Sequence, residues 1–150
     1  MIEFVTGDLL VADVEALVNP VNCVGVMGAG LARQFKERYP LNFEVYYRWC
    51  LLGKLCPGVI CDYKTGLKRN PKWIYNFPTR RHWKEKSNLQ DIELGLIALV
   101  TEVKLNGVES IAIPALGCGL GGLQWEDVKE LIENAFKILP GVKVLVYLPS

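Results

Sequence analysis

The 150-residue sequence has no apolar run long enough to cross a membrane and few residues of the kinds that bind metals. No stretch approaches the roughly 18 consecutive apolar residues of a transmembrane helix, and the polar start Met1–Glu3 does not resemble a signal peptide. One histidine, His82, and five cysteines without a Cys-x-x-Cys pair do not supply a usual zinc set. We therefore expect a cytoplasmic protein with reduced thiols, no membrane contact, no metal and no cofactor.

The chain also lacks internal repeats, low-complexity linkers and a large net charge. Its length fits one ordinary domain, its hydrophobic content of 51% excludes a disordered tail, and its formal net charge is +1. We expect one domain over residues 1–150, acting as a monomer.

Short β-branched or aromatic runs alternate with segments of helical spacing. This alternation predicts an α/β sandwich whose mixed, largely parallel sheet is covered on both faces. The expected strands are Ile2–Val5, Ala16–Val18, Val59–Cys61, Trp73–Phe77, Ile111–Pro114 and Val142–Leu148. The expected helices are Ala29–Tyr39, closed by Pro40, then Phe43–Leu52, Leu89–Leu105 and Trp125–Leu139.

Two glycine-rich loops each connect an expected strand to an expected helix. They are Gly25–Gly30 and Gly117–Gly122. Backbone N–H groups of such loops can bind phosphate oxygens, and both loops follow the carboxyl end of a strand, so they can face one crevice and grip a diphosphate. No G-x-G-x-x-G follows the first strand with an acid about 20 positions on, which sets aside a nicotinamide dehydrogenase.

Polar residues follow the first two strands. Asp8 could accept a hydrogen bond from an adenine amine, or it could only cap a local turn. In Asn19-Pro20-Val21-Asn22, two carboxamides flank an expected proline turn. They could bind ribose hydroxyls or orient a water, although asparagines also serve turns for local reasons.

The segment Lys64–Lys86 is strongly cationic, with eight basic residues and one acid. Aromatic residues are interleaved with these charges, which suits a polyanion with bases to stack, although a solvated basic hairpin would have the same composition. His82 could act as an acid or base, or stack beside Trp83. The interleaved rings are Trp73, Tyr75, Phe77, His82 and Trp83.

Taken together, these segments resemble the macrodomain family, whose members bind ADP-ribose and often hydrolyse its linkages. The resemblance implies a three-layer α/β/α sandwich. It rests on Thr6–Leu10, Ala16–Asn22, Gly28–Ala32 and Ile113–Gly119. Within the family the chain is most similar to DarG-type antitoxin macrodomains, which remove ADP-ribose from thymidine in DNA, and next to terminal ADP-ribose protein glycohydrolases. That similarity lies in Val21–Gly28, Gln34–Pro40, Asn76–Trp83 and Gly121–Trp125.

The resemblance implies roles for particular residues. Asp8 with the Leu9 amide would hold adenine near Tyr147, Asn22 would meet the distal ribose, and the glycine loops would wrap the diphosphate. The full ADP-ribose set would be Asp8, Leu9, Asn19, Asn22, Gly25, Val26, Met27, Gly28, Gly30, Thr79, Pro114, Leu116, Gly117, Cys118, Gly119, Leu120, Gly121 and Tyr147. Contacts to single-stranded DNA would come from Arg81, His82, Trp83, Lys84 and Lys86.

Arg80 departs from the pattern of these relatives, which place a catalytic lysine there. A guanidinium with a pKa above about 12 cannot attack as that lysine would. Arg80 could instead stabilise charge while Asn22 orients a water, the domain could be a reader without turnover, or Lys84 could replace the missing amine. Gly121 also stands where protein-directed relatives carry an aspartate.

The expected function is therefore an ADP-ribosyl glycohydrolase acting on DNA, with Arg80 and Asn22 as the catalytic residues. A reader, or a hydrolase of small ADP-ribose esters or phosphates, remains an alternative. Relatives of this kind continue into a region that binds a DNA ADP-ribosyltransferase toxin, so the chain could be the first part of a longer antitoxin.

Overall fold

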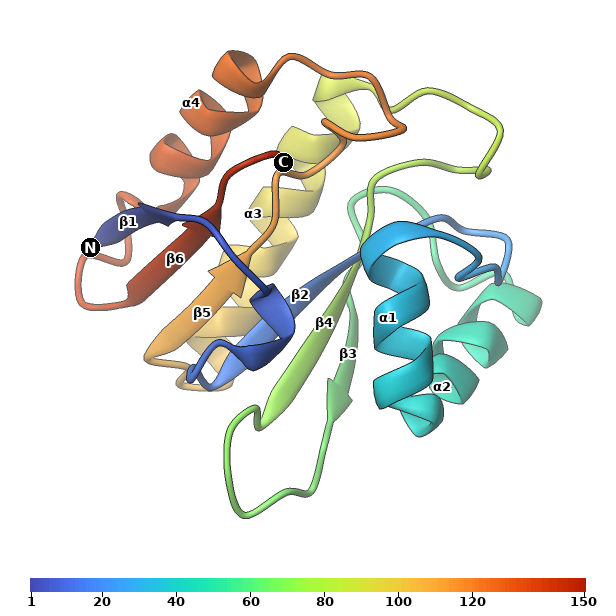
Figure 1. Cartoon of the computed structure of the whole chain (residues 1–150), viewed down its shortest axis with the longest axis horizontal. Coiled ribbons are helices and arrows are strands. Elements are labelled where there is room, and N and C mark those ends of the chain that lie inside the picture. The colour runs from blue at the N-terminus through green and yellow to red at the C-terminus, as the bar shows by residue number, and fades with distance from the viewer.

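Six strands form one mixed sheet in the order β1-β6-β5-β2-β4-β3 (Figure 1). This arrangement comes from a computed structural model that describes all 150 residues. Every neighbouring pair is parallel except β3 and β4, which are antiparallel. The predicted mixed, largely parallel sheet is confirmed. The strands are β1 Ile2–Val5, β2 Ala16–Val21, β3 Cys61–Lys64, β4 Trp73–Pro78, β5 Ser110–Ile113 and β6 Lys143–Tyr147.

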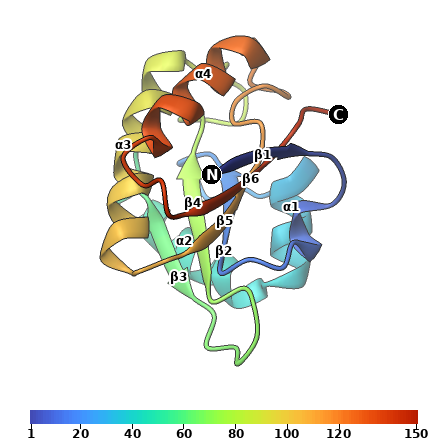
Figure 2. The same cartoon turned by 90° about the vertical axis from the view of Figure 1, so that its left-hand side faces the viewer.

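Helices cover both faces of this sheet, which makes the three layers that the sequence predicted (Figure 2). The helices are α1 Gly30–Arg38, α2 Pro40–Leu51, α3 Leu89–Leu105 and α4 Trp125–Phe136, with a short 3-10 helix η1 at Leu9–Val11. Helices α3 and α4 pack together on one face, and α1 lies on the other (Figure 2). No helix combines the length and apolarity needed to cross a bilayer.

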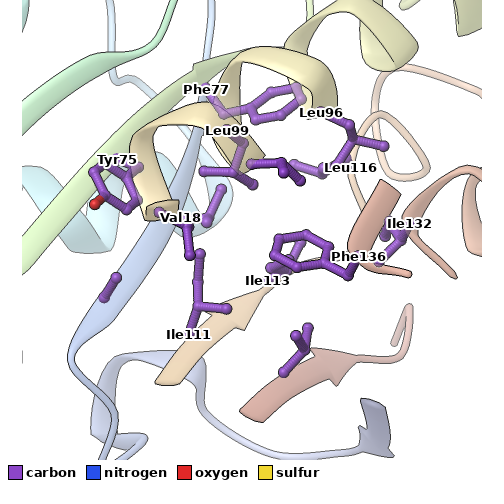
Figure 3. Packing of buried hydrophobic residues seen from close by; sticks show 14 of the residues in the cluster. Val18, Tyr75, Phe77, Leu96, Leu99, Ile111, Ile113, Leu116, Ile132 and Phe136 are labelled. Carbon is purple, nitrogen blue, oxygen red and sulfur yellow. The ribbon is translucent and has the colours of Figure 1, made fainter. Parts of the chain in front are cut away.

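The two faces of the strands bury different side chains. Val18, Phe77 and Ile113 point toward α3 and α4 and form the largest core cluster (Figure 3). On the opposite face, Leu17 packs in a smaller cluster with Phe35 of α1. This alternation is the period-two pattern of strands buried on both sides, and it holds the carboxyl ends of the parallel strands at one edge.

Helix α3 approaches the sheet closely at Gly95. A methyl group built on the Gly95 Cα would overlap the ring of Phe77, which is fully buried in β4. Glycine is therefore required here by the close packing of helix against strand, despite its weak helix propensity.

Several boundaries differ from the sequence prediction, among them the start of β3 and the start of α2. The strand expected at Val59–Cys61 begins only at Cys61 and continues to Lys64, because Ile60 is buried in the core and the half-buried Val59 packs on a smaller cluster, neither joining the ladder. Pro40 starts α2 as well as following α1, since proline lacks the N–H that the first turn of a helix leaves unpaired.

Candidate functional site

A cavity of about 1020 Å³ lies at the carboxyl ends of the five parallel strands and is lined by both glycine loops. This is the position at which open α/β sheets bind ligands. Among the residues expected from the sequence, those that line it are Asp8, Leu9, Asn22, Val26, Gly28, Gly30, Thr79, Arg80, Trp83, Pro114, Gly117, Cys118, Gly119, Leu120, Gly121 and Tyr147.

Four residues expected to contact the ligand do not line the cavity. The side chains of Met27 and Leu116 are buried in the core, and Asn19 is fully buried below the cavity floor. Gly25 turns away toward α2, where a Cβ would lie 2.9 Å from the ring of Tyr47. The expected ligand contacts of these four residues therefore remain predictions, and they could come only from backbone atoms.

Asn19 belongs to a buried amide network and not to a proline turn. Its Nδ2 donates to Asn76 Oδ1 at 3.0 Å, and Asn76 exchanges hydrogen bonds with Asn42 of α2. Pro20 continues strand β2 past the last residue that pairs with β5, where a missing N–H is tolerated. The network joins β2, β4 and α2, so Asn19 supports the first glycine loop from behind.

Asn22 is the side chain that shapes the first loop. Its Oδ1 accepts hydrogen bonds from the Val24 amide at 3.1 Å, the Val26 amide at 3.4 Å and the Tyr46 hydroxyl at 2.7 Å. Its Nδ2 donates to the Val26 carbonyl at 2.8 Å, which uses one of two hydrogens. The oxygen of Asn22 is therefore fully occupied and cannot accept a further hydrogen bond from a water, whereas the second amide hydrogen is free to donate to a ligand hydroxyl.

Tyr46 holds this arrangement from α2 and was missed by the sequence analysis. Its side chain is fully buried, and its hydroxyl also lies 2.9 Å from the Asn22 carbonyl oxygen. Burial raises the pKa of the Tyr46 hydroxyl, and the nearby thiol of Cys50 adds to this effect, so Tyr46 stays a neutral donor. The helical pattern of α2 predicts a buried residue at this position, but not its partner.

The second glycine loop is packed against Ser87. The Ser87 amide donates to the Gly121 carbonyl at 3.0 Å, and the Leu123 amide donates to the Gly117 carbonyl at 2.9 Å. A Cβ on Gly121 would overlap the Ser87 hydroxyl, which is buried without a hydrogen-bond partner. No larger residue fits at position 121 in this backbone, so an aspartate is excluded there by packing.

Asp8 both caps η1 and lines one end of the cavity. Its Oδ1 accepts a hydrogen bond from the Leu10 amide at 3.0 Å, while the side chain stays exposed. The turn-capping interpretation is therefore confirmed, and the second carboxylate oxygen remains available to a ligand. Tyr147 lines the same end, and its pKa is raised by partial burial and by the charge of Asp8.

Arg80 lines the cavity directly after β4. Its Nη1 donates to the Trp83 carbonyl at 2.9 Å, which anchors the guanidinium and leaves its other donors free. The Lys84 ammonium instead lies over the Trp83 ring, 5.0 Å from its centroid, and outside the cavity lining. Lys84 therefore does not take the place of an amine at position 80.

The remaining residues of this loop form its outer rim. The His82 Nδ1 accepts a hydrogen bond from the Lys84 amide at 3.1 Å, and the His82 and Trp83 rings lie 5.1 Å apart. Arg81 pairs with Asp91 at 3.5 Å, and Lys86 lies against Gly122. Of the five residues expected at DNA, only Trp83 also lines the cavity.

The cationic segment does not form one surface. Strand β4 separates the basic residues of Lys64–Lys72 from those of Arg80–Lys86 by six residues, or about 20 Å. Tyr75 and Phe77 are fully buried in that strand and cannot stack on bases. Of the two interpretations of this segment, a polyanion surface could use only part of it, because the strand carries Tyr75 and Phe77 into the core.

Helix α1 supplies further lining residues that were not expected. Gln34 lies one helical turn beyond Gly30 and joins the cavity wall, together with Leu31 and Ala32. Their proximity to the glycine loop is the signal that could have identified them. The chain end Leu148–Ser150 also lines the cavity beside Tyr147.

The cavity offers recognition groups and few groups that could exchange a proton. Burial, followed by the charge of Glu126, raises the pKa of the Cys118 thiol, which argues against a thiolate nucleophile at neutral pH. No group of His, Cys, Asp or Glu residues is arranged to hold a metal ion. The site can therefore bind an anion through backbone amides, donate hydrogen bonds from Asn22 and place a positive charge through Arg80.

Comparison with known proteins shows which family the chain belongs to. The chain is 49% identical over all 150 residues to the DNA ADP-ribosyl glycohydrolase of Mycobacterium tuberculosis, and it spans 43% of the length of that relative. It superposes on the macrodomain of Mycobacterium tuberculosis DarG with a TM-score of 0.98, covering 100% of this chain and 99% of that one. The macrodomain of Thermus aquaticus DarG is 48% identical, with a TM-score of 0.95 and 99% of each chain covered.

A further solved structure contains a ligand. Thermosipho africanus DarTG in complex with ADP-ribose is 37% identical, with a TM-score of 0.90, and the match covers 99% of this chain and 41% of that one. The Macro domain family matches residues 18–132, which include both glycine loops, Asn22 and Arg80. The chain belongs to the macrodomain family.

Proposed function

We propose that this domain binds ADP-ribose in the cavity and releases it from thymidine in DNA, as a DNA ADP-ribosyl glycohydrolase. The observation that carries the proposal is the convergence of both glycine loops between Asp8 at one end and Asn22 and Arg80 at the other. An acceptor for adenine, amides for a diphosphate and a donor for the distal ribose thus follow one another along one cavity. The names of the similar proteins from Mycobacterium tuberculosis and Thermus aquaticus support the reaction.

Arg80 defines what chemistry is open to the site. Its guanidinium cannot lose a proton to become a nucleophile, but its free donors can stabilise negative charge on a departing base. Hydrolysis would then break the bond between the ribose carbon and the base, with water supplying the new hydroxyl to the ribose and a proton to the base. Because the Asn22 oxygen is already occupied, the attacking water would be oriented by loop amides.

The substrate would enter over the rim formed by Arg81–Lys86. Trp83 is 46% exposed, carries the Lys84 ammonium over its ring and lines the cavity. An aromatic ring with adjacent cations suits a single-stranded DNA base and its phosphates. We propose that this rim binds single-stranded DNA and that the domain acts in the cytoplasm as a monomer, since one chain completes the cavity.

The longer relatives suggest a partner. The Thermosipho africanus relative is named as a fusion of a DNA ADP-ribosyl transferase and a DNA ADP-ribosyl glycohydrolase. We therefore propose that the domain counteracts a DNA ADP-ribosyltransferase toxin and forms the first part of a longer antitoxin.

Release of ADP-ribose from an ADP-ribosylated single-stranded oligonucleotide tests the reaction. We expect the wild-type protein to release ADP-ribose and Arg80→Lys to release it faster, since a lysine can add a covalent route. Arg33→Lys is the matched control, because Arg33 is exposed and paired with Glu37 on α1, outside the cavity lining. No release at high protein concentration, together with release by Arg80→Lys, would exclude hydrolysis by the wild-type chain.

A reader of ADP-ribose is the second candidate, and Arg80 is the observation that favours it. Both functions require ADP-ribose binding, so affinity alone does not separate them. A complex with ADP-ribose does, because a reader would keep the Arg80 side chain on the Trp83 carbonyl and away from the anomeric carbon of the distal ribose. A hydrolase would turn free guanidinium donors toward the side of that carbon on which the departing base would lie.

A further inference from the structure

A second cavity, of about 510 Å³, lies at the opposite end of the sheet from the first. Its walls come from the residues after η1, from the junction of α1 and α2, and from the turn between β3 and β4. No residue lines both cavities. Its lining residues are Leu10, Val11, Ala12, Asp13, Arg38, Tyr39, Pro40, Leu41, Tyr63, Thr65, Leu67, Arg69, Asn70 and Pro71.

Hydrogen bonds hold the walls of this cavity in place without a ligand. The Thr65 hydroxyl donates to the Pro71 carbonyl at 2.7 Å, and the Lys72 ammonium donates to the Leu67 carbonyl at 3.0 Å. Asn70 Nδ2 donates to Asp13 Oδ1 at 3.0 Å and so ties the turn to the other wall. A cavity with fixed walls loses less conformational entropy on binding than a mobile loop does.

Two guanidinium groups in this cavity have no partner. The ion pairs of the protein are Arg33 with Glu37 and Arg81 with Asp91, so neither Arg38 nor Arg69 is neutralised. The one acid in the lining, Asp13, already accepts a hydrogen bond from Asn70. The turn from Lys64 to Lys72 adds further cations and no acid. Unpaired guanidinium groups beside one cavity favour a phosphate, which they bind with paired donors.

Aromatic and apolar side chains line the rest of the cavity. Tyr39 and Tyr63 are both half-buried and pack on the core cluster below, which fixes their rings. Leu10, Leu67 and Pro71 complete an apolar wall. A flat aromatic ring next to a phosphate matches this combination better than inorganic phosphate does, because bases stack on tyrosine rings.

We infer that this second cavity binds a nucleotide, with its phosphate at Arg38 and Arg69 and its base at Tyr39 and Tyr63. The nucleotide is either free or part of a DNA strand. The inference does not rest on the activity proposed for the first cavity. It also assigns a use to the basic turn Lys64–Lys72, which lies too far from the first cavity to serve it.

Amide chemical shifts of the full chain, measured with the first cavity saturated by ADP-ribose, test this inference. The probes are thymidine 5′-monophosphate, a ten-residue oligothymidylate and inorganic phosphate, each added separately. We expect one or both nucleotide probes to shift the amides of Leu10–Asp13 and Leu67–Asn70, and binding only of the oligonucleotide would identify a DNA strand as the source. Phosphate binding as strong as nucleotide binding, or no shift with any probe, would overturn the assignment.

Variants locate the binding. Arg38→Gln and Arg69→Gln should each weaken nucleotide binding by about tenfold, the typical loss for one hydrogen bond to a charged group. Arg33→Gln removes the same charge from α1 outside the cavity and should leave binding unchanged. Equal weakening by all three variants would show general charge attraction and no site. Unchanged ADP-ribose binding and thermal midpoint in each variant establish that the first cavity and the fold are intact.

Discussion

Removal of the Tyr46 hydroxyl should loosen the first glycine loop without unfolding the domain. In Tyr46→Phe, Asn22 Oδ1 loses its shortest hydrogen bond, of 2.7 Å, but keeps those from the amides of Val24 and Val26. Because the oxygen is not left unpaired, the cost should be near that of one ordinary hydrogen bond, about 1 kcal/mol. For a chain of this length that corresponds to a fall in Tm of roughly 2–4 °C.

The same change should weaken ADP-ribose binding, because Asn22 holds the Val24–Val26 backbone in the shape that faces the cavity. We expect a Kd for ADP-ribose several-fold higher by calorimetry, alongside the small fall in Tm. Tyr47→Phe is the matched control, since the Tyr47 hydroxyl has no hydrogen-bond partner and its ring, which lies against Gly25, is retained. A lower Tm with an unchanged Kd would refute the positioning role and leave Tyr46 as core packing only.

Two further predictions concern stability. Gly95→Ala should cost about 1–3 kcal/mol in urea unfolding, because the new methyl group overlaps the Phe77 ring, whereas Gly141→Ala, with nothing within 4 Å, should be close to neutral. Burial raises the pKa of the Cys61 thiol from 9.0 to about 12, so its contribution is fully present below pH 9 and is lost as pH rises toward 12. Between pH 8 and 10 in a reductant, the wild-type protein should therefore lose about 1.4 kcal/mol more unfolding free energy than Cys61→Ala, and Cys56→Ala at an exposed position should behave as wild type. Equal losses of stability in both Gly→Ala variants would contradict the close packing of Gly95 against Phe77. Equal pH dependence of stability in Cys61→Ala and wild type would contradict the raised pKa of the buried thiol.

The sheet and the main cavity could be predicted because their signals are local. Short apolar runs identified five of the six strands and overlapped β3 only at Cys61, and the strand-to-helix glycine loops identified the edge at which the cavity lies. Asp8 was predictable for the same reason, since a polar residue directly after a parallel strand lies at the same edge as those loops.

The contacts behind the loops could not be predicted, because they join residues distant in sequence. Tyr46 lies 24 positions from Asn22 in the sequence, and the whole of α3 separates Ser87 from Gly121 in the chain although the two residues are in contact. A tyrosine in a helical apolar stripe is read as core whether or not its hydroxyl has a partner. The arrangement of the basic segment could not be predicted either, since β4 places its two groups of basic residues at opposite ends of the sheet.

Ligand binding and chemistry depend on different groups in the main cavity, so the residue at position 80 can change from lysine to arginine while the fold and the binding groups remain. The groups proposed to bind the ligand are mostly backbone amides of two glycine loops, whose shapes are fixed by hydrogen bonds to the Asn22 side chain and to the Ser87 amide. A proton or a covalent bond, in contrast, would have to come from a single side chain, and burial raises the pKa of the Cys118 thiol, which disfavours its thiolate as that group. Substitution at Arg80 should therefore alter the rate of ADP-ribose release far more than the affinity for ADP-ribose. Substitution at Tyr46 should alter the affinity more than the rate. Measuring both quantities for both variants separates the two contributions, and a parallel loss of rate and affinity at Arg80 would show that the guanidinium holds the ligand.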